Sequence, residues 1–100
     1  MKKDLIAPMH PGEALREDFM KPAGISINGL AIELRVPVTR ISEIVNERRG
    51  ITADTAMRLG RYFSTTGQFW MNLQTRYDLD RAADESHGEI ERSIRPRTAA

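Results

Sequence analysis

The sequence contains no cysteine, so disulfide bonds, thiolate nucleophiles and cysteine-ligated metal sites are excluded together. Two histidines are too few to support extensive metal chemistry. No long hydrophobic run is present either: near the N-terminus only Leu5, Ile6 and Ala7 are consecutive apolar residues, too few for a signal-peptide core or a membrane-spanning helix. We therefore expect a cytoplasmic protein with no cofactor and no metal ion.

Aromatic residues are also scarce, at 6% of the chain. What is present suits a small folded domain: 100 residues, of which 40% are hydrophobic and 29% charged. That length allows one compact domain with a short tail and excludes a large multi-domain enzyme.

The formal net charge is only +1, but the charges are unevenly distributed. Residues 1–77 hold 11 basic and 8 acidic side chains, whereas residues 78–100 hold 4 basic and 6 acidic ones. A mildly basic body is therefore followed by an acidic tail.

The hydrophobic periodicity indicates helix nearly throughout, and no alternating run bounded by turn residues predicts a strand. We predict an all-α fold of five helices. The expected segments are 11–20, from Ser26 to Pro37, 38–47, from Thr52 to residue 63, and 67–80.

The predicted boundaries rest on capping and breaking residues. Ser26, Thr52 and Thr66 are suited to cap the helices that follow them, while Pro22 and Gly24 should end the first helix. Residues 1–10 are then an N-terminal extension and residues 11–80 the domain. Residues 81–100 are too polar to order themselves alone, so we expect a flexible tail, only partly ordered.

The segment from Ser26 to Arg49 is the most informative part of the chain. Two short helices joined by a tight turn, each with one apolar stripe, make a helix-turn-helix unit. Ile41, Ile44 and Val45 cluster on one side of the second helix. The opposite side is polar and hydrogen-bonding, with Arg40 on the flank: Thr39, Ser42, Glu43 and Asn46. The alternative is a purely structural helical hairpin.

Three blocks of sequence extend this pattern: His10 to Glu13, Arg48 to Ala56, and Phe69 to Gln74. Together with the helix-turn-helix run from Leu30 to Asn46, they resemble the HigA-type (VapI-like) antitoxins of the XRE, or lambda-repressor-like, family. The resemblance covers about residues 8 to 79. It implies a DNA-binding antitoxin that forms a homodimer, represses its own operon and neutralises a RelE-like ribonuclease toxin.

The sequence departs from that family at three positions. Arg35 stands where the turn commonly has a left-handed glycine, and because a residue with a side chain pays about 1 to 2 kcal/mol there, we expect a distorted turn. Glu43 places a carboxylate on the DNA-facing surface, where it can accept from cytosine N4 but repels phosphates if misplaced. Glu47 stands where the family often has a helix-ending glycine.

We expect the N-terminal half of the recognition helix to enter the major groove, so Thr39, Ser42 and Glu43 are assigned to base edges. Asn46 lies on the same face. The predicted phosphate contacts are Ser26 with the backbone amides that it caps, and Arg40, Arg48 and Arg49. The alternative for every one of these residues is an ordinary solvated surface.

The DNA contacts of one subunit are so few that a monomer would bind weakly, so we expect a homodimer, which doubles them. The dimer would place two recognition helices roughly 34 Å apart on a palindromic operator in double-stranded DNA. The aromatic stretch of the last helix supplies the predicted dimer interface: Phe69, Trp70, Leu73 and Tyr77. For Trp70 and Leu73 the alternative is an ordinary core position.

No residue cluster predicts an enzyme. His10 stands at a helix start with no partner ligand, where capping is the simpler role. Glu13, Glu17 and Asp18 lie on a helix surface with no nucleophile nearby. Two other functions remain open beside the antitoxin: a stand-alone XRE-type repressor without a toxin, and a protein-interaction bundle that does not bind DNA.

Overall fold

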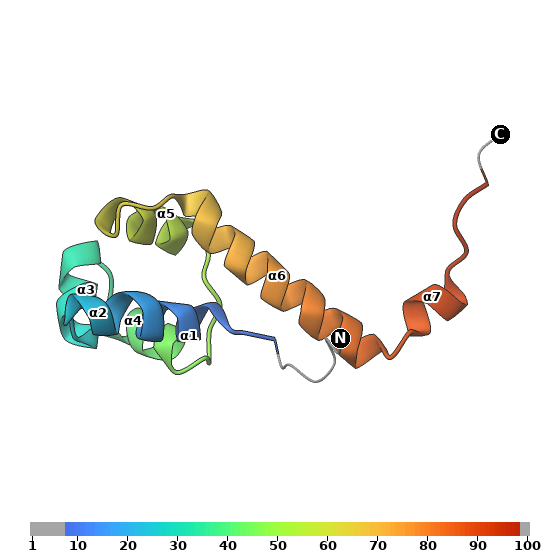
Figure 1. The fold of residues 1–100 in the computed structure, drawn as a ribbon, viewed down its shortest axis with the longest axis horizontal. Helices are drawn as coiled ribbons and strands as arrows, with labels where there is room; N and C mark the ends of the chain where they lie inside the picture. Colours follow the sequence, from blue (N-terminus) through green and yellow to red (C-terminus); the bar gives the residue numbers. More distant parts are fainter. Residues whose placement is uncertain (1–7, 99–100) are drawn as a thin grey trace.

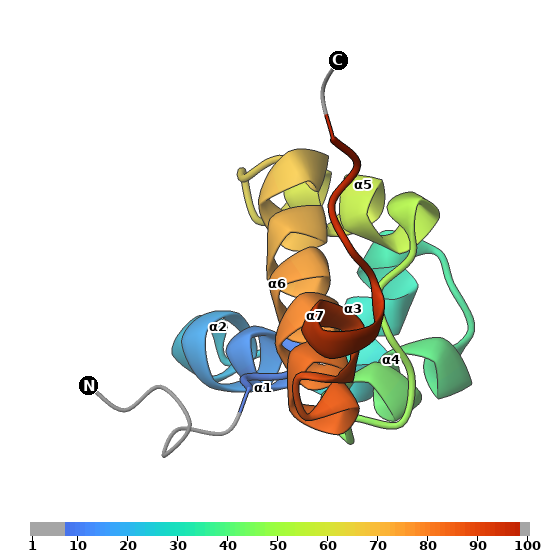
Figure 2. The ribbon, with the colours of Figure 1, turned by 90° about the vertical axis from the view of Figure 1, so that its right-hand side faces the viewer.

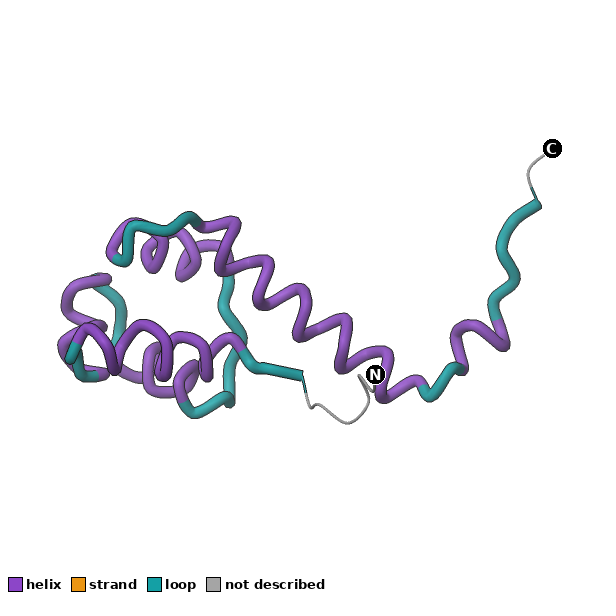
Figure 3. The backbone as a smooth tube through the Cα atoms, viewed as in Figure 1, coloured by secondary structure: helices purple, strands orange, loops and turns teal. Residues whose placement is uncertain are grey.

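The computed structural model describes residues 8–98, and every regular element in that range is helical (Figures 1 and 3). The all-α prediction is confirmed. Residues 1–7 of the predicted N-terminal extension and residues 99 and 100 lie outside the described range. In chain order the elements are α1 (Pro11–Ala14), η2 (Leu15–Met20), α2 (Lys21–Ala23), α3 (Ile27–Leu34), α4 (Val38–Val45), α5 (Ala53–Tyr62), α6 (Gly67–Ser86) and α7 (Glu89–Ser93).

The first three elements form one uninterrupted helix from Pro11 to Ala23, so the predicted end at residue 20 was wrong. Pro22 is tolerated because the turns before it are π-helical: the Lys21 N–H reaches the Arg16 carbonyl, five residues back. Gly24 does end the helix, as predicted, with the left-handed dihedrals φ 66° and ψ 30°.

Three helices begin at the predicted capping residues. The Gly29 N–H donates to Ser26 Oγ at 3.0 Å, and the Phe69 N–H donates to Thr66 Oγ1 at 3.0 Å. Thr52 caps α5 through the Thr55 N–H at 3.5 Å. Each bond satisfies a backbone donor that a helix leaves open at its start, which fixes these boundaries locally.

The core lies where α1, η2, α3, α4, α5 and the first half of α6 meet. Its largest fully buried side chains include Leu15, Leu30, Ile41, Ile44, Leu59 and Trp70. The Trp70 ring packs on Phe19 with centroids 4.7 Å apart, and its Nε1 donates to Thr65 Oγ1 at 2.8 Å. Trp70 therefore lies in the core, which was the alternative to its assignment to the dimer interface.

Gly60 permits a close approach between α5 and the turn that begins α6. A Cβ atom there would lie 2.6 Å from the Thr66 carbonyl carbon, so α5 can press against the turn that begins α6 only because position 60 lacks a side chain.

Helix α6 leaves the core diagonally and continues past the body of the molecule (Figures 1 and 2). It ends at Ser86, beyond the predicted residue 80, because i,i+4 ion pairs such as Arg81 with Glu85 support its polar second half. The structure measures 53 × 32 × 23 Å, and its radius of gyration of 16.7 Å exceeds the ~13 Å typical of a compact 100-residue domain. Among residues 8–98, no helix is long and apolar enough to span a membrane.

Candidate nucleic-acid interface

The turn between α3 and α4 is a regular left-handed cap, although it contains no glycine. Arg35 has φ 60° and ψ 47°, close to the ideal left-handed values of about 57° and 47°. The Val36 N–H donates back to the Ala31 carbonyl at 3.1 Å, which closes the end of α3. The distortion expected at Arg35 is therefore absent: the residue adopts the left-handed conformation, and the turn keeps its regular geometry.

Helix α4 divides into a buried and an open side, in agreement with its periodicity. Ile41 and Ile44 are fully buried and Val45 is 3% exposed. Thr39 and Asn46 are exposed, whereas Ser42 and Glu43 are half-buried. A helix anchored on one side in this way presents a polar stripe to solvent.

The C-terminal end of α4 is held by the first helix. A Cβ atom at Gly12 would lie 1.8 Å from the Ile44 carbonyl oxygen, so only glycine permits this contact between α1 and α4. One helical turn later, Arg16 Nη1 donates to the Val45 carbonyl oxygen, and Arg16 Nη2 lies 3.5 Å from Glu47. The recognition helix is thus fixed by backbone contact rather than by apolar packing alone.

His10 starts this first helix and has the predicted capping role. Its Nδ1 accepts a hydrogen bond from the Gly12 N–H at 2.8 Å, and its ring stands edge-on to Tyr77 with centroids 4.8 Å apart. Burial lowers the pKa of His10, which keeps the ring neutral and its Nδ1 able to accept.

Three arginines were assigned to phosphates, and the structure gives them different surroundings. Arg40 Nη1 pairs with Asp54 of α5 at 2.8 Å, and Arg49 Nη2 pairs with Glu43 at 2.7 Å. Arg48 is exposed and, within residues 8–98, forms no ion pair. Of the three, Arg48 is accordingly the one without a carboxylate partner among the described residues, whereas Arg49 would have to exchange a carboxylate for a phosphate.

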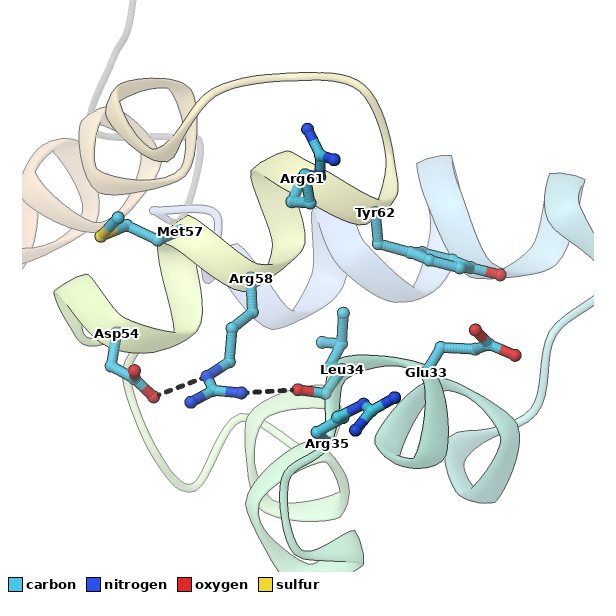
Figure 4. A pocket seen from close by; sticks show the side chains of 8 residues that line it. All are labelled: Glu33, Leu34, Arg35, Asp54, Met57, Arg58, Arg61 and Tyr62. Carbon is cyan, nitrogen blue, oxygen red and sulfur yellow. Dashed lines mark hydrogen bonds and ion pairs between the residues drawn. The ribbon is translucent and has the colours of Figure 1, made fainter.

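Arg58 joins α5 to the end of α3 across a groove (Figure 4). Its Nη1 donates to the Leu34 carbonyl at 2.8 Å and its Nε pairs with Asp54 at 3.0 Å. Hydrogen bonds from Arg58 and Arg40 hold the pKa of Asp54 below its usual value. The groove is lined by Glu33, Leu34, Arg35, Asp54, Met57, Arg58, Arg61 and Tyr62. This bridge fixes the helix-turn-helix unit against α5.

The polar residues assigned to DNA are also unequal in their local bonding. Ser26 Oγ is occupied by its cap, and Asn46 Nδ2 donates to the Ser42 carbonyl at 2.8 Å, closing the end of α4. Among the described residues, Thr39 has no hydrogen-bond partner for its hydroxyl. The Thr39 hydroxyl, near the start of α4, is therefore open to an outside partner, whereas the Ser42 hydroxyl lies 3.4 Å from Asn46 Nδ2.

The four residues assigned to a dimer interface lie in different environments. Trp70 is fully buried within its own chain, so it offers no surface to a second copy. Phe69 is 37% exposed, and Leu73 and Tyr77 are half-buried. Tyr77 also accepts a hydrogen bond from Arg81 at 3.0 Å.

Sequence reasoning did not identify Arg16 and Gln74 as supports of the interface. Gln74 of α6 is buried, and its Oε1 accepts from the Ile51 N–H at 2.6 Å, directly after the loop that carries Arg48. The available signals were the glycines that lie against these contacts, Gly12 and Gly50.

Known proteins are similar to this chain in sequence over most of its length. The chain is 53% identical over 83 residues to virulence-associated protein I of Dichelobacter nodosus, covering 83% of this chain and 77% of that protein. Antitoxin HigA-1 of Vibrio cholerae is 33% identical over 79 residues, with coverage of 79% and 74%.

Solved structures extend the comparison. The Pseudomonas aeruginosa antitoxin HigA, determined with the higBA promoter, has a TM-score of 0.87 at 48% identity and covers 91% of this chain and 99% of its own. Antitoxin GraA in complex with its operator has a TM-score of 0.88 at 42% identity, with coverage of 94% and 95%. No family model matches the sequence. On the strength of these relatives and of the helix-turn-helix geometry, the chain belongs to the HigA family of antitoxins.

Proposed function

We propose that this HigA-family antitoxin represses its own operon by placing α4 in the major groove of operator DNA. The observation that carries the proposal is the polar, solvent-facing side of α4, on a helix whose C-terminal end is held by Arg16 through the Val45 carbonyl oxygen. The preceding turn keeps regular geometry at Arg35, and Arg58 ties α3 to α5. A rigid helix with an open polar stripe is what base reading requires.

Within this proposal the residues divide by role. Thr39 reads a base edge from the start of α4 and Ser42 from its middle, and Glu43 accepts from a cytosine N4 once Arg49 leaves it. Asn46 lies on the same face but first closes the helix end.

Phosphate contacts set the register of the domain on the duplex. They come from Arg48, from Arg49 and Arg40 after exchange of their carboxylate partners, and from the N-terminal amides of α3 at Ser26. Arg48 is the strongest of these assignments because nothing in residues 8–98 competes for it.

We further propose that the protein acts as a homodimer on a palindromic site, with Phe69, Leu73 and Tyr77 of α6 contributing to the interface. Few base contacts per subunit favour a two-fold arrangement that doubles them. Sedimentation equilibrium tests this point. A protein that remains monomeric at the concentrations that shift DNA would contradict it.

The partner proposed for the antitoxin is a RelE-like ribonuclease toxin encoded beside it. Co-expression of this chain with the product of the adjacent gene, followed by co-purification, tests the pairing. Expression of the adjacent gene alone should stop growth, and co-expression with this chain should restore it. If the product of the adjacent gene neither binds this chain nor is toxic, the stand-alone repressor is favoured.

Repression itself is tested by gel shift with the DNA directly upstream of the gene that encodes this chain. We expect a shift at low salt and, with a scrambled duplex of the same composition, a markedly weaker one. No shift at low salt would exclude both the antitoxin-repressor and the stand-alone repressor, and would leave the protein-interaction bundle.

A further inference from the structure

We propose that Gln74, on α6 and outside the helix-turn-helix unit, is a positioning residue for DNA binding. The residue is only 9% exposed, and its Oε1 accepts from the Ile51 N–H at 2.6 Å. Ile51 follows the loop, residues 46–50, that carries Arg48 and Arg49 away from α4. The inference rests on the proposed function, because the loop matters only if those arginines meet phosphates.

The loop has few other constraints. Its first half is tied to α4, with the Glu47 N–H donating to Ile44 and the Arg48 N–H to Glu43 at 2.8 Å. Glu47 then adopts a left-handed conformation, φ 62°, which turns the chain away from the helix axis. Among the described residues, the hydrogen bond that the Ile51 N–H makes is the one to Gln74. The backbone at the end of the loop is therefore held from α6, in addition to the ion pair between the Arg49 side chain and Glu43 of α4 at 2.7 Å.

Two features show that the contact is built into the chain. A Cβ atom at Gly50 would lie 2.9 Å from Gln74 Oε1 and from Nε2, so a side chain at position 50 would displace the Gln74 amide from this place. The Gln74 Nε2 donates to Asp78 Oδ1 at 3.0 Å, one turn further along α6. Because a carboxylate only accepts, Asp78 directs the Gln74 nitrogen toward itself and the Gln74 oxygen toward Ile51.

Loss of the Gln74 acceptor would leave a buried backbone N–H unpaired at Ile51, which is 3% exposed. The loop would then shift to find another partner, and Arg48 and Arg49 would lose their fixed direction. A phosphate contact depends on that direction because the DNA backbone offers its oxygens at fixed spacing.

The test is the salt dependence of DNA binding by Gln74→Leu, followed by fluorescence anisotropy on the promoter duplex. We expect roughly tenfold weaker binding and a slope of log K against log salt that falls by about 0.9 for each phosphate that the variant no longer binds. A variant that is merely less stable binds DNA less because part of it is unfolded, but its folded fraction keeps the same slope. An unchanged slope would overturn the proposal.

A paired substitution provides the rescue. Gln74→Glu alone puts a second carboxylate beside Asp78 and should bind worse. Gln74→Glu combined with Asp78→Asn exchanges the amide and the carboxylate between the two positions, so the total charge is unchanged. The new amide at position 78 can donate to one oxygen of the new carboxylate at position 74, while the other oxygen accepts from Ile51. This double variant should recover the wild-type slope, and failure to recover it while folded would contradict the assignment.

The matched control is Gln68→Leu on the same helix, where an exposed glutamine donates to Asn72 at 2.8 Å and, among the described residues, makes no hydrogen bond with residues 46–51. It should leave both affinity and slope unchanged, and an equal loss in this control would overturn the proposal. If Gln74→Leu does not fold, Gln74→Asn, which keeps the amide but shortens its reach, serves the same comparison. No binding by the wild-type protein would instead count against the proposed function.

Discussion

At the scale of single residues, Arg35 holds a backbone conformation that a side chain makes costly. Its φ of 60° is unstrained for glycine, and its side chain is exposed and lies at the rim of the α3–α5 groove. We expect Arg35→Gly to raise the free energy of unfolding by about 1 kcal/mol, since the left-handed penalty outweighs the added chain entropy. Urea denaturation measures the change. As a control, Arg76→Gly in the exposed interior of α6 should lower stability by about 1 kcal/mol.

His10 makes stability depend on pH. Burial lowers its pKa in the folded state, more than Glu47 and Asp78 raise it, so the unfolded chain binds the proton more readily. The stabilising contribution is complete above the unfolded pKa, about 6.5, and is lost as pH falls toward the lower folded value. His10→Asn keeps an acceptor for the Gly12 N–H but does not titrate, and should reduce the loss of thermal stability as the pH falls below about 6.5. An unchanged pH profile would contradict this role.

At the scale of elements, α4 and the loop after it should separate base reading from phosphate binding. Arg48→Ala should weaken binding to all sequences alike and reduce the salt slope by about one. Thr39→Ala should cost about 1 to 3 kcal/mol, mainly on the operator. Competition with random DNA distinguishes the two, and Arg92→Ala on α7 is the charge-matched control. Equal losses on random and operator DNA for Thr39→Ala would remove its assignment to a base.

The elements also show which features can be predicted from sequence. The caps at Ser26, Thr52 and Thr66 were predictable because a cap is settled by residues within one turn of it. The buried side of α4 followed from periodicity for the same reason. The predicted end of the first helix before Pro22 was wrong because a π-helical stretch accommodates the proline, and hydrophobic spacing does not reveal such a stretch.

The supports of the candidate interface could not be predicted because they join residues far apart in the sequence. Gln74 and Ile51 are 23 residues apart, and Arg16 and Val45 are 29 apart. Ion pairs such as Arg40 with Asp54 change which arginines are free, although all of them look alike in the sequence. Local patterns therefore locate the recognition helix, while the chain's folding decides which of its charges are available.

At the scale of the whole molecule, the chain beyond α6 should contribute little to folding. Every residue of α7 is exposed, including Ile90 at 52%, and the following Ile94 is exposed at 64%. Truncation after Gly88 should change the free energy of unfolding by less than about 0.5 kcal/mol. Calorimetry or urea denaturation of the truncated protein measures this. If the free energy of unfolding fell by more than about 1 kcal/mol, these residues would have to pack against the folded domain of the same chain or of a second copy.

The chain has a single tryptophan, and Trp70 sits where α6 meets the aromatic side chains of the core. Its indole is fully buried and hydrogen-bonded to Thr65, and it belongs to α6 and not to α4. The protein therefore carries its own fluorophore: emission should move to longer wavelength when the domain melts and stay constant when a duplex is added. Folding and DNA recognition can thus be followed separately in one cuvette, without a label.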